Sequence, residues 1–472
     1  MDPYEQFNQI LKNAAEAFKA IDKKEVIRVI SHLDADGISA CSILLKLLNN
    51  ENRKYSVSIV PQLSRNVILN HSTEPYNVFM FTDIGSGVIE DIKELLNGKK
   101  VFILDHHTIP ETSYEGINFV NPHLCGIDGG KEISGAGVVF KFACAVDSSM
   151  EDFAHIAIIG AMGDLQDQKG FLRLNKEILD VAIARGRIKM NKGLRIFGAQ
   201  TKPLHKALEY CTDPFIPGVS GSESGAIQFL HQIGIDPKNG NGWKKIVHLD
   251  DEDMKKLVTG IIMKRFNETN PDDVLGNIYI LPHEQEESPT RDAKEFATLL
   301  NACGRLGRAS FGIGACLGDK KIKQQAIRSL NDYKKEIVNA LQWYNNSKHS
   351  NDIFWGEGFV IINAKENVMS TMIGTLASIL SKSNIMTNNN FILSMARSLE
   401  NNTKVSLRAI NNVNGEFDLR VIVEEMLKNI GNTESGGHQN AAGAVIPTDK
   451  ESEFIEAAKE VLGKYSVEER IG

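Results

Sequence analysis

The chain repeats one local pattern three times: a short apolar run, a cluster of Asp or His residues and, in two of the three cases, a segment with the apolar spacing of a helix. The apolar runs are Glu25–Ile30, Asn77–Phe81 and Lys100–Leu104. Short buried strands that alternate with helices predict a largely parallel sheet covered by helices. Ligands bind such sheets beyond the carboxyl ends of the strands, so we expect the three polar clusters to converge in space.

The composition and apolar pattern of the remaining sequence predict two further regions. Proline and glycine become frequent beyond about residue 195, residues 226–265 have a helical pattern, and strand-like and helix-like segments alternate again from about residue 352. A glycine-rich loop is predicted at 435–443. We therefore predict three domains, which are listed here: an N-terminal α/β domain over 1–200, a connector with an inserted, mainly helical region over 201–350, and a smaller α/β domain over 351–472.

The composition excludes several classes of protein. With 42% hydrophobic and 24% charged residues, the chain is no disordered polymer. The net charge of −7 argues against coating of nucleic acid by bulk charge. The six cysteines form no C-x-x-C pair, which fits reduced intracellular thiols, and no stretch approaches the roughly 18 apolar residues of a membrane span. We expect a cytoplasmic protein that does not engage a membrane.

Eight side chains in the polar clusters are candidate metal ligands or catalytic groups. They are His32, Asp34, Asp36, Asp83, Asp105, His106, His107 and Asp164. His32, Asp34 and Asp36 alternate, so an extended backbone would point them to one side. Each residue could instead serve a turn or cap a helix, but neither role requires their joint occurrence at successive strand ends. Carboxylates this close repel one another unless cations neutralise them, and two divalent ions would provide that charge. Mixed His and Asp ligands favour manganese, with magnesium as the alternative.

The motifs SHLDADG, FTDIG, LDHH and GAMGD, in this order, resemble the four motifs of the DHH phosphoesterase superfamily. Near the other end, GGHQNAAG over 436–443 resembles the signature of the DHH-associated C-terminal domain. The resemblance implies that His32 and Asp34 bind one metal ion, that Asp36, His106 and Asp164 bind a second, and that Asp83 bridges the two. It also implies that His107 reaches the scissile phosphate and that Asp105 supports a histidine.

The C-terminal signature has a physical rationale of its own. Glycines expose backbone N–H groups that can line an anion, and His438 adds a donor. Upstream, Ser406 and Arg408 alternate on a predicted strand and so share one face. This is the strand and loop that hold the nucleotide in the family, so the candidate substrate-binding residues are Ser406, Arg408, Gly436, Gly437 and His438.

The segment between the two signatures discriminates among members of the superfamily. Residues 291–308 resemble part of the RecJ-like single-strand exonucleases, especially the archaeal branch that pairs with the GINS replication complex. Residues 291–336 contain ten Lys or Arg and five Asp or Glu, a local charge of +5, which is either a solvated helix face or a groove for a strand. Arg305 and Arg308 are the first candidates for such a groove.

We therefore expect a two-metal exonuclease that acts on an end of single-stranded DNA or RNA in replication or repair. One alternative is an oligoribonuclease or cyclic-dinucleotide phosphodiesterase, although short enzymes of that kind lack the roughly 150 residues between the signatures. A second alternative, of another class, is a GINS-binding replisome component with accessory nuclease activity. A family II pyrophosphatase is the least expected, because that enzyme lacks the C-terminal signature.

Overall fold

The structure is a computed structural model that describes residues 2–168, 170–211, 214–382, 390–398, 401–410, 417–431 and 433–471. The chain divides into two compact units, Met1–Leu330 and Asn331–Gly472. Each unit is described by itself below.

The first unit is built on a five-stranded parallel sheet with the order β2-β1-β3-β4-β5. Its strands are β1 (Val26–His32), β2 (Lys54–Val60), β3 (Val78–Thr82), β4 (Lys100–Leu104) and β5 (Asn118–Val120). The three strands predicted from apolar runs are the three inner strands. The edge strands β2 and β5 are half polar or very short, so their sequences carry little signal.

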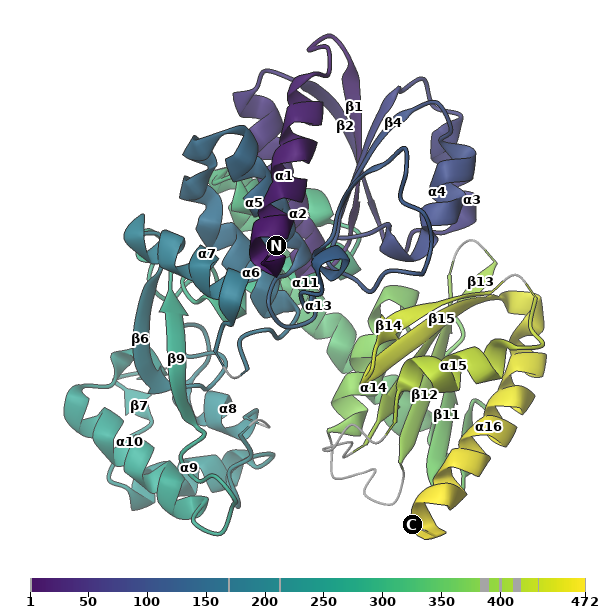
Figure 1. Ribbon diagram of the computed structural model, residues 1–472. Helices are drawn as coiled ribbons and strands as arrows, with labels where there is room; N and C mark the ends of the chain where they lie inside the picture. Colours follow the sequence, from purple (N-terminus) through teal and green to yellow (C-terminus); the bar gives the residue numbers. More distant parts are fainter. Residues whose placement is uncertain are drawn as a thin grey trace. The chain divides into compact units, whose positions relative to one another are not determined.

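Alternate residues of the inner strands face two different layers of helices (Figure 1). On one side Val29, Met80 and Leu104 pack against a core that includes the four helices α1 (Pro3–Lys19), α2 (Ala35–Asn50), α5 (Gly135–Val146) and α6 (Ala154–Gly163). On the other side Ile30 and Phe81 join the core that contains α3 (Arg65–Ser72) and α4 (Ile89–Leu95). The sheet is thus buried on both faces, which leaves its carboxyl edge for polar side chains.

A smaller subdomain with its own apolar core follows α7 (Arg173–Ala184). It comprises the antiparallel pair β6 (Lys189–Leu194) and β9 (Leu275–Ile280), the two-stranded hairpin of β7 (Lys238–Asn239) and β8 (Gly242–Trp243), and the helices α8 (Leu204–Glu209), α9 (Glu223–Gln232) and α10 (Asp251–Lys264). The prediction of helix over 226–265 is wrong between α9 and α10. Gly234 there has a φ of +74°, and Pro237 cannot donate the hydrogen bond that a helix interior requires.

The helices after this subdomain return to the first sheet. They are α11 (Ala293–Arg305), α12 (Ala309–Cys316) and α13 (Lys320–Ser347), and the first two bury their apolar faces in the core around α2 and α6. The contact with the start of α2 is close: the backbone N–H of Ala35 donates to Oδ1 of Asn301 at 3.1 Å, and a Cβ atom on Gly304 would lie 1.6 Å from the carbonyl oxygen of Leu33. Helix α11 therefore supports the loop that begins α2.

The second unit is a six-stranded mixed sheet with the order β10-β11-β12-β13-β15-β14. Its strands are β10 (Ile353–Gly356), β11 (Phe359–Asn363), β12 (Phe391–Arg397), β13 (Asn402–Ala409), β14 (Glu434–His438) and β15 (Ala441–Pro447). Helix α14 (Ile373–Ser381) contacts β12 and β13, while α15 (Leu419–Leu427) and α16 (Glu451–Ile471) contribute to the core on the sheet. The loop predicted at 435–443 is instead the hairpin of β14 and β15, because its small residues allow close strand pairing.

Two sequence-based observations on the whole chain can be compared directly with the structure. All six cysteines are free thiols, as their spacing suggests. Among the described residues, every helix is too short or too polar to pass through a bilayer.

We predict that Gly304→Ala destabilises the first unit by about 1 to 3 kcal/mol, because the added methyl group must push α11 away from Leu33. The measurement is urea denaturation followed by circular dichroism. The matched control is Gly87→Ala, where a Cβ atom would meet nothing within 4 Å. Equal midpoints for the two variants would contradict the tight contact.

Candidate metal centre

The eight candidate ligands and catalytic groups gather at the carboxyl edge of the first sheet. His32 ends β1, Asp83 follows β3, and Asp105, His106 and His107 follow β4. Three further carboxylates come from helix ends, since Asp34 is the N-cap of α2, Asp36 lies in its first turn and Asp164 follows α6 directly. The sheet topology thus collects residues that are far apart in the sequence.

Six of these side chains form two groups around Asp83. Nδ1 of His32 lies 3.0 Å from Oδ2 of Asp34 and 3.8 Å from Oδ2 of Asp83. Nε2 of His106 lies 3.3 Å from Oδ1 of Asp83, 3.3 Å from Oδ2 of Asp164 and 3.7 Å from Oδ2 of Asp36. Each oxygen of Asp83 therefore faces one group, which is the division that the motif resemblance implies.

Asp36 reaches the cluster by a different route from the one predicted. Helix α2 begins at Ala35, with Asp34 as its N-cap, so His32, Asp34 and Asp36 do not alternate along an extended backbone. Instead, the carboxylate of Asp36 accepts hydrogen bonds from the backbone N–H groups of Gly135 at 2.6 Å and Ala136 at 3.0 Å. The first turn of α5 thus fixes Asp36, as orphan donors at a helix start readily do for an anion.

Glycines give the buried carboxylates their space. A Cβ atom on Gly135 would lie 2.3 Å from Oδ1 of Asp83, and one on Gly160 would lie 2.4 Å from Oδ1 of Asp36. The sequence signal of these glycines, small residues in the motifs SGAG and IIGAMG, does not tell which side chain fills the space.

The ring of His106 is oriented by a backbone carbonyl that the sequence did not indicate. Its Nδ1 donates to the carbonyl oxygen of Gly129 at 2.7 Å, and Nε2 of Gln166 donates to the same oxygen at 3.0 Å. This bond places a proton on Nδ1, so Nε2, which faces the carboxylates of Asp36, Asp83 and Asp164, is the ring atom that could bind an ion. Gln166 is held in turn by Asn175, whose Nδ2 donates to Oε1 of Gln166 at 2.5 Å.

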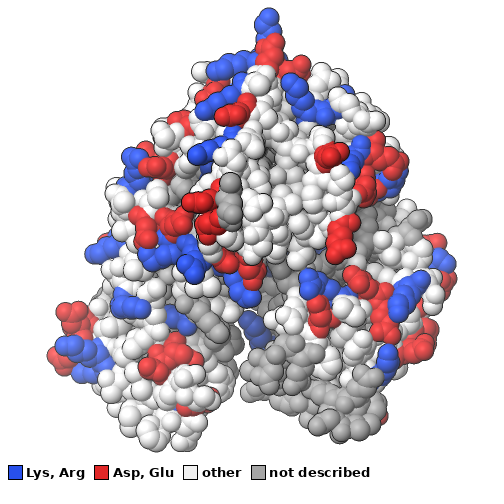
Figure 2. Space-filling view, in the orientation of Figure 1, with Lys and Arg blue, Asp and Glu red and all other residues white. Residues whose placement is uncertain are grey.

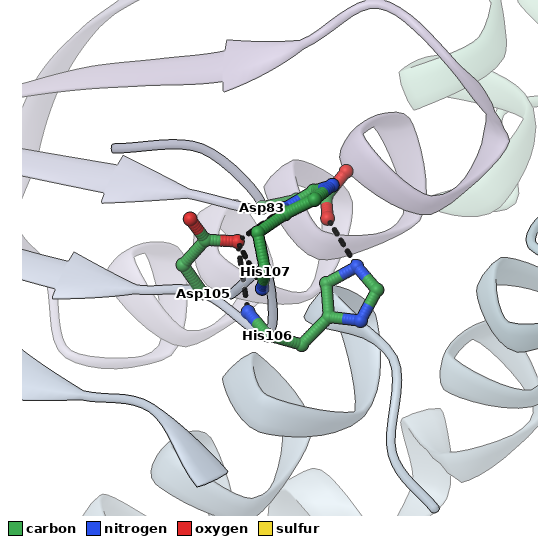
Figure 3. Close-up of side chains that lie close together, drawn as sticks. All are labelled: Asp83, Asp105, His106 and His107. Carbon is green, nitrogen blue, oxygen red and sulfur yellow. Dashed lines mark hydrogen bonds and ion pairs between the residues drawn. The ribbon is translucent and has the colours of Figure 1, made fainter. Parts of the chain in front are cut away.

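Asp105 is saturated by hydrogen bonds from the chain itself. Its Oδ1 accepts from the backbone N–H of His106 at 2.8 Å and from Nδ1 of His107 at 2.8 Å, and its Oδ2 accepts from the backbone N–H of Ser86 at 2.9 Å. Figure 3 shows Asp105 beside the two histidines, with Asp83 on the other side of His106. The contact fixes the ring of the partly exposed His107 and leaves its Nε2 directed away from Asp105.

The electrostatics of the cluster favour positive charge among its carboxylates. Burial raises the pKa of Asp83 well above its ordinary value, and the neighbouring carboxylates of Asp36 and Asp34 raise it further. Burial and then Asp36 raise the pKa of Asp164 in the same way. Burial alone would lower the pKa of His106, but Asp164 and Asp36 outweigh it and raise that pKa to about 9.

Two buried atoms test whether the cluster suits metal ions. Among the residues that the structure describes, Oδ1 of Asp83 and Nε2 of His106 are buried without a hydrogen-bond partner, although such atoms are nearly always paired in proteins. Both face the shared volume of the cluster, in which three or more His and Asp ligand atoms lie within 4.8 Å of one another. The donor set, carboxylate oxygens with imidazole nitrogens, therefore fits divalent ions of the manganese or magnesium type.

The candidate substrate-binding residues of the second unit are brought together by strand register. Ser406 on β13 pairs with Gly443 on β15, which pairs with Gly436 on β14. Nη1 of Arg408 donates to Oγ of Ser406 at 2.9 Å, and Nε of Arg408 donates to Oγ of Ser378 on α14 at 3.0 Å, so Ser406 and Arg408 share a face as predicted. Gly437 lies beside Gly436 in β14 with a φ of +131°, and the side chain of His438 lies outside the described residues.

Arg305 and Arg308 lie at the junction of α11 and α12, both partly buried. Nη1 of Arg308 donates to Oγ of Ser329 on α13 at 3.2 Å, so this side chain also serves packing between helices. Figure 2 shows Lys and Arg intermixed with Asp and Glu over the face of the first unit that it draws.

Three family models match the chain in succession: the DHH family N-terminal domain over 26–163, the DHH-CID domain over 196–278 and the DHHA1 domain over 357–464. The chain is 34% identical over 468 residues to the uncharacterized protein MJ0831 of Methanocaldococcus jannaschii, and the alignment covers 96% of this chain and 98% of that protein. It is 27% identical over 174 residues to the single-stranded-DNA-specific exonuclease RecJ of Bacillus subtilis, and that alignment covers 35% of this chain and only 22% of that protein.

Solved structures share the fold at low sequence identity. RecJ of Thermus thermophilus in complex with Mn²⁺ has a TM-score of 0.59 at 17% identity, covering 97% of this chain and 55% of that one. CDC45 of Entamoeba histolytica has a TM-score of 0.64 at 11% identity and covers 98% of this chain and 99% of that one. The chain therefore spans about half of the RecJ structure but the whole of the CDC45 structure.

We predict opposite effects of Asp83→Asn on the metal-free and the manganese-loaded protein. Because the pKa values of Asp83 and Asp164 are raised in the fold, the metal-free protein loses stability as pH rises above the ordinary carboxyl pKa of 3.8. At pH 8 the metal-free variant should therefore be more stable than metal-free wild type. At pH 4 this difference in stability should disappear. Mn²⁺ at a hundredfold excess over its Kd should stabilise wild type by about 2.7 kcal/mol, and the variant by much less.

The measurement is thermal unfolding with EDTA or with Mn²⁺ at both pH values. Asp180→Asn is the matched control, because Asp180 is an exposed carboxylate on α7 outside the cluster. A stabilisation by Mn²⁺ that survives Asp83→Asn unchanged would contradict the assignment of the cluster as a metal centre.

Proposed function

Because this chain belongs to the DHH superfamily and has a RecJ-like fold, we propose that it is a metal-dependent exonuclease that hydrolyses phosphodiester bonds at an end of single-stranded DNA or RNA. The observation that carries the proposal is the complete ligand cluster. Six His and Asp side chains converge in two groups that share Asp83, and two of their buried atoms accept or donate no hydrogen bond among the described residues.

In the proposed centre, His32 and Asp34 hold one ion, and His106, Asp36 and Asp164 hold the second. Asp83 offers one oxygen to each. Bound divalent ions would supply Lewis acidity toward a phosphoryl group and a low-pKa water for attack on it. We favour manganese for this mixed donor set, with magnesium as the alternative, and the similar RecJ structure contains Mn²⁺.

His107 and Asp105 form the proposed catalytic pair beside the ions. The bond from Nδ1 of His107 to Asp105 leaves Nε2 to contact the scissile phosphate. Burial opposes ionisation of Asp105, but the adjacent His107 outweighs it and holds the pKa of that carboxyl well below its ordinary value, so Asp105 is an anion that fixes the imidazole beside it. The imidazole of His107 would then lie beside the phosphoryl oxygens on which negative charge develops.

The second unit contributes the proposed nucleotide-binding surface. Ser406 and Arg408 supply hydroxyl and guanidinium donors from β13, and Gly436 and Gly437 supply a side-chain-free backbone in β14, which lies beyond β15 in the same sheet. Donors of this kind recognise a terminal phosphate. His438 is proposed as a further donor on sequence grounds, and Arg305 and Arg308 as contacts to the strand from the first unit.

We predict that Asp83→Ala abolishes hydrolysis, with a loss of at least a thousandfold, while the variant remains folded. The reason is that both proposed ions lose a shared ligand. The assay is digestion of end-labelled single-stranded DNA and RNA with Mn²⁺, resolved by product length so that polarity is also read. Asp180→Ala is the control, and wild-type activity in Asp83→Ala would refute the mechanism.

Substrate length separates the exonuclease from the enzymatic alternative. Faster hydrolysis of dinucleotides or cyclic dinucleotides than of long strands would identify an oligoribonuclease or cyclic-dinucleotide phosphodiesterase. The replisome alternative draws on the whole-length fold match with CDC45. Co-purification with GINS in the absence of measurable hydrolysis would favour that alternative.

A further inference from the structure

Three aromatic rings are exposed on the subdomain over 196–278. Phe197 is 36% exposed, Tyr210 at the end of α8 is 57% exposed, and Trp243 in β8 is 42% exposed. They come from three separate segments, yet all three lie next to α8 or to the segment that precedes it. We call these three rings the aromatic platform.

Lysine ammonium groups lie over the faces of the platform. Nζ of Lys202 is 4.9 Å from the ring centre of Phe197 and 4.8 Å from that of Tyr210, so one cation bridges two rings. Nζ of Lys238 is 5.7 Å from the ring centre of Trp243, whose other neighbour is the ring of His205 at 4.1 Å. Lys206 also approaches Tyr210, but it is paired with Glu209 and Glu223 at 2.8 Å each.

Exposed rings interleaved with cations have the chemistry that recognises single-stranded nucleic acid. Bases stack on aromatic faces whatever their sequence, and ammonium groups bind the phosphates between them. We propose that the aromatic platform is a second binding surface for the single-stranded substrate, in which Phe197, Tyr210 and Trp243 stack bases while Lys202 and Lys238 contact phosphates. The assignment of the ligand as a substrate strand rests on the proposed function.

The platform is joined to the metal centre by a short structural path within the first unit. A cavity of about 40 Å³ is lined by Met162 and Asp167, on either side of Asp164, and also by Phe197 and Lys294. One wall of this cavity therefore belongs to the chain around a proposed metal ligand, and another belongs to the platform.

Helix α11 contacts both the segment that follows Phe197 and the start of α2. The backbone N–H of Gln200, three residues after Phe197, donates to Oε1 of the buried Glu295 at 3.0 Å, and the hydroxyl of Thr201 donates to Oε2 at 2.5 Å. The other end of α11 contacts the start of α2 through Gly304. Nine residues of helix separate the two contacts, about 14 Å at 1.5 Å per residue. At about 3.4 Å per nucleotide, a dinucleotide is shorter than this separation, whereas a strand of about twenty nucleotides is much longer than it.

Charge favours a strand over a protein as the occupant. The cations lie directly on the exposed rings, and a polyanion satisfies both at once, whereas a protein partner would have to supply an acid beside each apolar contact. The subdomain also exposes Phe266, at 72%, beyond the end of α10 and outside the platform. That ring serves as the matched control below.

The test measures binding of the full chain, with Mn²⁺ present, to fluorescent phosphorothioate oligothymidylates that resist hydrolysis. For a strand of about twenty nucleotides, Tyr210→Ala should raise Kd about tenfold, Tyr210→Phe should restore it because the ring remains, and Phe266→Ala should leave it unchanged. The preference of wild type for this strand over a dinucleotide should shrink in Tyr210→Ala. An unchanged Kd in Tyr210→Ala would overturn the proposal and leave the surface to a protein partner.

Salt dependence separates the two kinds of contact. Lys202→Gln should reduce the slope of log Kd against log salt concentration by about 0.7, while Tyr210→Ala should weaken binding with the slope unchanged. Hydrolysis of labelled strands is scored separately. If Tyr210→Ala binds weakly and wild type hydrolyses nothing, the proposed nuclease activity is refuted and the aromatic platform is supported. If wild type hydrolyses strands and the Kd is unchanged in both variants, the platform is refuted and the nuclease activity is supported.

Discussion

The structure depends on the crowding of buried carboxylates at one edge of a parallel sheet. Asp36, Asp83 and Asp164 surround Nε2 of His106 at 3.3 to 3.7 Å, and burial together with mutual repulsion raises the pKa values of all three acids. Such an arrangement destabilises the folded state unless cations offset the negative charge. This destabilisation is consistent with the proposal that the cluster binds divalent ions.

Rigid parts of the fold hold the cluster in place. The first turn of α5 binds Asp36, the carbonyl of Gly129 orients His106, and glycines at 135 and 160 leave room for the acids. Helix α11 contacts Leu33, in the loop before α2, through Gly304, and it accepts a hydrogen bond from the backbone N–H of Gln200 through Glu295. One helix of the inserted region thus connects the loop of the metal centre with the surface proposed to hold the strand.

The sequence indicated which residues gather at the sheet edge better than it indicated how they are positioned there. Asp83 and His106 could be predicted because strand ends in a parallel sheet converge wherever the chain places them. The position of Asp36 in a helix turn was missed, because the alternation of His32, Asp34 and Asp36 reads equally well as a strand. Gln166 and Asn301 were also missed, since both act through single hydrogen bonds to backbone atoms distant in sequence. The platform left no motif, because its three rings come from separate segments.

The central claim is that the cluster is a two-metal centre, and anomalous scattering from crystals grown with Mn²⁺ tests it most directly. The account predicts two manganese peaks roughly 4 Å apart, one beside His32 and Asp34 and the other beside His106 and Asp164, with Asp83 between them. A single peak, or peaks that do not contact Asp83, would contradict it.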